Sequence, residues 1–107
     1  MYKVLFRIEK LELVDKLKTK ITNLKTYMEE VGKDLQIEIV FSGNVVEYFK
    51  GDYSYFKRPD LDVALCQNAL NTAKMEAIFD ENIRTVRAGI GEIIEKKSQG
   101  WIEFTIE

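Results

Sequence analysis

The spacing of hydrophobic residues divides the chain into segments with strand periodicity and segments with helix periodicity. Residues 2–8 alternate between apolar and polar side chains, as in a strand with one buried face, and residues 101–106 do the same. Residues 35–41 are rich in β-branched apolar side chains. Residues 63–65 have no polar partner on either face, as expected for a strand that is covered on both sides. Together with residues 83–88, these segments predict five strands.

Helix periodicity fills the intervals between the strands. In residues 11–31 apolar side chains recur every three or four positions and form one stripe, opposite a face that carries lysines. Gly32 follows, where a glycine in the left-handed conformation commonly ends a helix. Further helices are predicted over residues 45–50, 68–79 and 89–98.

Several details of these helices depend on individual residues. Gly43 suits a tight turn from strand to helix, and Asn44 is predicted to cap the helix that follows it. The helix over residues 68–79 is predicted to break near Met75. In the last helix, three isoleucines are predicted to face inward: Ile90, Ile93 and Ile94.

Strands that alternate with helices predict right-handed crossovers and a parallel sheet with helices on both faces. We therefore expect a single domain, residues 1–107, with an α/β fold. This fold is a three-layer α/β/α arrangement with a mainly parallel sheet of about five strands and a flavodoxin-like or Rossmann-like topology. The order of the strands does not follow from the sequence. The half-polar strand at residues 101–106 is expected at or near an edge of the sheet.

Residues 48–56 contain five aromatic side chains in nine positions. Such a segment could be a lid over a pocket or part of a subunit interface, since aromatic residues are favoured at both. The alternative is a loop that is packed by its own side chains.

Cys66, the single cysteine, stands where a buried strand gives way to a predicted helix. In open α/β sheets, ligands and reactive groups collect at the carboxyl ends of the strands. The partial positive charge at a helix N-terminus favours a thiolate over a thiol. The alternative is that Cys66 is a small buried hydrophobic residue, as most single cysteines of intracellular domains are.

In a parallel sheet, four strand ends would lie along one edge, and the strand end with Cys66 is one of the four. They carry small amides, glycines and two arginines, an environment that suits an anion or a thiolate. Either arginine would favour the thiolate if it lay close to Cys66, and the alternative for both is ordinary surface charge. The candidate binding residues at this edge are Arg7, Gly43, Asn44, Gln67, Asn68, Arg87 and Gly89.

Composition excludes several other functions. The net charge of −2 gives no basis for binding nucleic acid or an anionic membrane, and no apolar run approaches the roughly 20 residues of a membrane span. The absence of histidine removes Cys–His pairs and the commonest zinc ligand, so we expect no metal. No P-loop or dinucleotide motif is present, so we expect no cofactor. One cysteine excludes an intramolecular disulfide and fits a reducing compartment, which predicts a cytoplasmic location.

The stretch Cys66-Gln67-Asn68-Ala69-Leu70 resembles the Cys-Asn-Asn-Thr-Leu motif of small stand-alone members of the DsrE/DsrF-like family. The resemblance extends over nearly the whole chain. Residues 4–8 and 37–43 are similar to the first two strands of the family. Residues 86–90 resemble its Val-Pro-Ala-Gly-Val turn, and residues 99–101 resemble the entry to its final strand.

This resemblance implies a layered α/β/α fold and a role in sulfur relay, in which Cys66 accepts a sulfane sulfur as a persulfide and passes it on. It also implies a homo-oligomer, a trimer or a hexamer, and a protein that donates or accepts sulfur as a partner. The alternative function is a non-catalytic oligomeric α/β protein that binds a small anion or a partner protein, with Cys66 merely packed.

Overall fold

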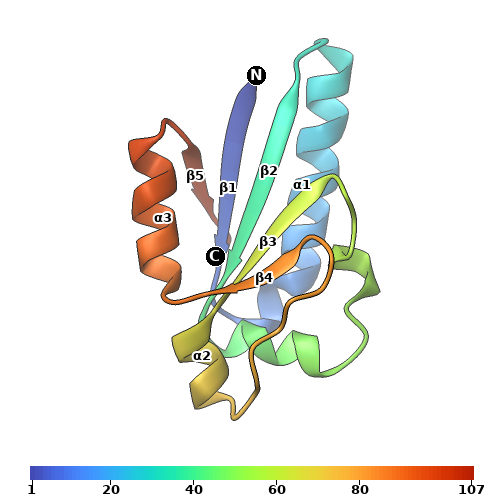
Figure 1. Ribbon diagram of the computed structural model, residues 1–107. Helices are drawn as coiled ribbons and strands as arrows, with labels where there is room; N and C mark the ends of the chain where they lie inside the picture. The colour runs from blue at the N-terminus through green and yellow to red at the C-terminus, as the bar shows by residue number, and fades with distance from the viewer.

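The computed structural model describes residues 1–107 and contains a single sheet of five parallel strands (Figure 1). The expected α/β class and parallel sheet are therefore confirmed. The strand order is β4-β3-β2-β1-β5, which differs from the orders of flavodoxin and of the Rossmann fold. The strands are β1 (Tyr2–Ile8), β2 (Leu35–Phe41), β3 (Leu61–Cys66), β4 (Ile83–Val86) and β5 (Ile102–Thr105).

Helices cover both faces of this sheet, but unequally. One face carries α1 (Val14–Glu30), the 3₁₀ helix η2 (Gly43–Lys50) and the short α2 (Gln67–Thr72), and 19 buried residues form its core. The other face carries only α3 (Gly89–Ser98), which lies apart from α1 across the sheet in Figure 1. The apolar core on the α3 side has five buried residues, namely Leu5, Val40, Ala64, Ile93 and Trp101.

The predicted stripe of the first helix is confirmed in its first half, because Val14, Leu17 and Ile21 of α1 are buried against the sheet, whereas Val31 at the far end is exposed. The expected edge position of the last strand is also confirmed. β5 pairs only with β1, and Phe104 packs edge-to-face on Phe6 with ring centroids 5.9 Å apart.

The aromatic segment is a loop that is packed by its own side chains. Phe56 is fully buried within the chain, and its ring packs edge-to-face on Phe41 and Tyr48 at centroid distances of 5.1 and 5.5 Å. Tyr53 donates a hydrogen bond to Asp80 at 2.9 Å. These contacts favour the packed loop over the lid and the interface.

The break predicted near Met75 is present, since α2 ends at Thr72, but the helix predicted to follow it up to residue 79 is absent. Lys74 adopts the left-handed conformation with φ of 58°, and the N–H of Met75 donates to the carbonyl of Leu70 at 2.9 Å. This geometry is a Schellman cap in which lysine occupies the position that glycine usually takes. Because lysine does not mark this position as glycine would, the sequence predicts the break near Met75 and not at Thr72.

The inward orientation predicted for three isoleucines of α3 is correct only for Ile93. Ile90 and Ile94 are 62% and 61% exposed. The reason is that α3 turns Glu92 and Lys96 toward a charged side chain of the sheet, Glu38, which leaves the two other isoleucines outside.

The prediction that Asn44 caps its own helix is wrong. Its Oδ1 accepts a hydrogen bond from the N–H of Leu11 at 2.9 Å and thereby ties the turn after β2 to the turn after β1. Gly43 lies at the same junction with φ of 68°, and a Cβ on it would stand 2.6 Å from the carbonyl oxygen of Glu9. Two turns therefore meet where only glycine fits.

We predict that Gly43→Ala destabilises the protein more than Gly32→Ala. Both glycines have nearly the same left-handed φ, which costs a non-glycine residue about 1–2 kcal/mol, but nothing lies within 4 Å of a Cβ on Gly32. The clash with Glu9 should add about 1–3 kcal/mol to the loss at Gly43. Urea unfolding measures both variants, and equal losses would contradict the close approach.

Candidate functional site

Cys66 is the last residue of β3 and the N-cap residue of α2, as the sequence predicts. Its backbone is extended, with φ of −70° and ψ of 120°, and no side chain caps the helix. The residue is 7% exposed, so most of it is packed. The free thiol is thus held between the end of a buried strand and the first turn of a helix.

Cys66 lines an open hollow of about 340 Å³ at the carboxyl edge of the sheet. Gly43 and Asn44 reach this hollow from the end of β2, and Asn68 reaches it from α2. No cation lines it. The structure therefore brings three predicted binding residues together with the cysteine, and the remaining lining residues are Glu47, Ala69, Thr72 and Ala73.

Gly89, the first residue of α3, covers Cys66 from the other face of the sheet. A Cβ on Gly89 would stand 3.4 Å from the Cβ of Cys66 and 3.3 Å from Cγ1 of Val40. The N–H groups of Gly89, Ile90 and Gly91 donate to no backbone carbonyl or side chain. The N-termini of two helices, each with a partial positive charge, therefore lie beside Cys66.

The remaining predicted binding residues lie away from the hollow. Arg7 belongs to β1, two strands from Cys66, and pairs with Glu103 at 3.7 Å and with Glu9 at 3.9 Å. Gln67 donates to the side chain of Asn71 at 2.9 Å.

Arg87 is exposed and forms no ion pair. It lines a neighbouring open hollow of about 570 Å³ that Asn68 also borders. Neither arginine lines the hollow at Cys66, and the one charged side chain that does is the carboxylate of Glu47. The partial positive charges beside the cysteine are those of backbone N–H groups at helix N-termini.

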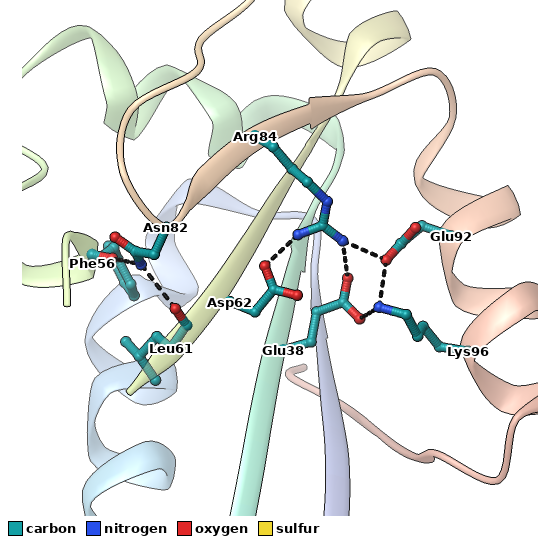
Figure 2. A network of polar contacts seen from close by, with 8 residues as sticks. All are labelled: Glu38, Phe56, Leu61, Asp62, Asn82, Arg84, Glu92 and Lys96. Atoms are coloured by element: carbon teal, nitrogen blue, oxygen red, sulfur yellow. Dashed lines mark hydrogen bonds and ion pairs between the residues drawn. The ribbon is translucent and has the colours of Figure 1, made fainter. Parts of the chain in front are cut away.

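A cluster of charged residues on the α3 face was not foreseen from the sequence (Figure 2). We call Glu38, Arg84, Glu92 and Lys96 the ion quartet. Arg84 and Lys96 donate to Glu38 at 3.0 and 2.8 Å, and the same two cations donate to Glu92 at 2.7 and 3.0 Å. Arg84 also pairs with Asp62 of β3. The signal in the sequence was a glutamate among the buried apolar residues of β2.

Glu38 is 0% exposed, and burial raises its pKa to about 7. Its hydrogen bonding with Glu92 adds to this rise, while Lys96 opposes it. The pKa of Glu92 is lowered, first by its hydrogen bonding with Glu38 and then by the two cations. Glu38 therefore takes up a proton more readily than Glu92, because burial penalises the charged form of the more deeply buried carboxyl group.

No three cysteine, aspartate or glutamate side chains are arranged to hold a metal ion. No helix of the chain combines the length and apolar character that crossing a bilayer requires.

Comparisons with known proteins support the fold. A scan against protein-family models gives no match to this chain, and a search of curated proteins also gives none. Among solved structures, the chain is similar to a protein of unknown function, MTH1491 from Methanobacterium thermoautotrophicum. The TM-score is 0.81 at 24% sequence identity, and the alignment covers 98% of this chain and 99% of that chain. At this identity the likeness shows the fold alone.

Proposed function

We propose that this protein is a sulfur carrier that holds a sulfane sulfur as a persulfide on Cys66. The observation that supports it best is the position of Cys66, which lines a hollow at the start of α2 and lies against the first residue of α3. Helix N-termini stabilise negative charge on sulfur, as a nucleophilic thiolate requires. The resemblance of residues 66–70 to the DsrE/DsrF-like motif supports the same chemistry.

The transfer needs no oxidant. The Cys66 thiolate attacks the outer sulfur of a donor persulfide, R–S–SH, and a new S–S bond forms to Cys66 Sγ. The donor S–S bond breaks, and R–S⁻ leaves. In the second step an acceptor thiolate attacks the outer sulfur on Cys66, takes it as a persulfide and restores the Cys66 thiolate. The sulfane sulfur keeps its oxidation state throughout.

The hollow supplies room and polar groups for the additional sulfur. Asn44 and Asn68 line it, and the side-chain N–H groups of both are free of hydrogen bonds within the chain. They are suited to donate to a persulfide anion. A protein that delivers or removes the sulfur would approach at this open edge. The reducing cytoplasm is the compartment that suits a carrier with one free thiol.

We predict that incubation with glutathione persulfide adds one sulfur atom to the folded protein, because Cys66 borders an open hollow. Intact-mass analysis measures the addition, and dithiothreitol should reverse it. The Cys66→Ser variant should gain no sulfur under the same conditions.

The contradicting result is a thiol that stays unmodified in the folded protein and reacts only after unfolding. Cys66 would then be a packed core residue. The chain would fit the alternative function, a non-catalytic protein that binds an anion or a partner.

We also propose that the chain forms a homo-oligomer, a trimer or a hexamer, as its resemblance to the DsrE/DsrF-like family implies. The aromatic segment does not supply this interface, since Phe56 is already buried within one chain. A better surface is the apolar groove of about 410 Å³ between α1 and the edge strand β5, where Tyr27, Ile102 and Phe104 are exposed. A second copy that covers this groove would also remove an open sheet edge.

We predict that light scattering at micromolar concentration gives a mass above that of one chain, and that Phe104→Ser lowers it because the groove loses an apolar side chain. Ile90→Ser, on the exposed face of α3, serves as the matched control and should leave the mass unchanged. A monomeric wild-type protein would contradict the proposal.

A further inference from the structure

The apolar contact between α3 and the sheet is small. Of the ten residues of α3, only Gly89 and Ile93 are buried, and the core on this side contains five residues against 19 on the α1 side. Elements with few buried apolar contacts open at a lower free energy than the rest of a protein. We therefore expect α3 to open more readily than α1.

Ionic contacts make up the rest of the attachment. The ion quartet joins α3 to the sheet through two contacts, from Glu92 to Arg84 of β4 at 2.7 Å and from Lys96 to Glu38 of β2 at 2.8 Å (Figure 2). Two further contacts at 3.0 Å hold the quartet together, one between Glu38 and Arg84 of the sheet and one between Glu92 and Lys96 of α3. Lys96 also lies 5.0 Å from the centre of the Trp101 ring. The attachment of α3 thus depends on charges that are buried beneath it.

The first turn of α3 lies directly over Cys66. Gly89 is buried against Cys66, Val40 and Ser42, close enough that a Cβ there would be in tight contact with all three. Any displacement of this turn would uncover the side of Cys66 that faces away from the hollow.

We infer that α3 is a cover over Cys66, and that Glu38 controls how readily the cover opens through the ion quartet. This inference rests on the proposed function in one respect, namely that the cover would regulate access to a thiol that carries sulfur. The opening itself is a property of the fold and can be measured without any sulfur donor.

The charges that face Glu38 determine the direction of the effect. They come from Asp62 on β3, Arg84 on β4, and Glu92 and Lys96 on α3, while β1 presents only the apolar Leu5. With every group ionised, three carboxylates face two cations, which leaves one uncompensated negative charge beneath α3. With Glu38 protonated, the charges balance.

Protonation of Glu38 therefore favours the closed cover. The pKa of Glu38 is about 7 beneath α3, against an ordinary value of 4.5 in an open, hydrated state. A group whose pKa is raised in the closed state stabilises that state at low pH, and this stabilisation is lost as the pH rises through the higher value. The equilibrium constant for the opening of α3 should increase about tenfold between about pH 6 and pH 8 and then level off.

We predict that hydrogen exchange of the α3 amides, corrected for their intrinsic rates, shows this tenfold loss of protection, while the α1 amides show none. Glu38→Gln keeps the shape of the side chain but cannot ionise, so protection of α3 should become independent of pH. Glu95→Gln is the matched control. It makes the same substitution at an exposed position of α3 that forms no ion pair, and it should keep the pH dependence.

Alkylation of Cys66 tests whether opening uncovers the thiol. The ratio of the wild-type rate to the Glu38→Gln rate cancels the ionisation of the thiol itself, and it should rise about tenfold over the same pH range. A constant ratio, or α3 protection that does not change with pH in the wild type, would overturn the inference. If α3 opens as predicted but Cys66 takes up no sulfur, the cover stands and the proposed carrier function fails.

Discussion

Parallel strands in one sheet are joined by right-handed crossovers, and this rule sets the asymmetry of the molecule. From β1 to β4 the chain moves across the sheet in one direction, so α1, η2 and α2 fall on the same face. Only the connection from β4 to β5 reverses direction, and it places α3 alone on the other face. One face thus receives three covering segments and the other receives ten helical residues.

The ion quartet follows from this asymmetry. A parallel sheet requires cover on both faces, and a ten-residue helix cannot bury a wide apolar surface. Glu38 and Arg84 of the sheet face α3, and Glu92 and Lys96 of α3 pair with them. Replacing buried ion pairs by apolar residues is often neutral for stability. The clearer consequence of the quartet is that it fixes the rotation of α3, with Ile93 inward and Gly89 against Cys66.

The site lies at the carboxyl edge of the sheet, but not where the strand order reverses. The reversal falls between β1 and β5, whereas the hollow lies beyond the ends of β2 and β3. Gly43 and Asn44 form one wall of it because the turn after β2 is held against the turn after β1. The position of the thiol is thus set by two turns, the start of α2 and the cover of α3.

The sequence by itself determined the elements and the neighbourhood of Cys66, since periodicity and the glycine turns depend on local physics. It predicted β1, β2 and α3 at their observed bounds, and the meeting of Gly43, Asn44 and Asn68 with the cysteine. Only the tertiary structure decided the strand order, because five strands with these sequences could form a parallel sheet in many different orders. It likewise decided that Arg7, two strands from Cys66, pairs with Glu103 on the edge strand β5, and that Glu38 is buried beneath α3 between partners from two other elements, β4 and α3. Such partners are brought together by packing, which the spacing of residues along the chain does not specify.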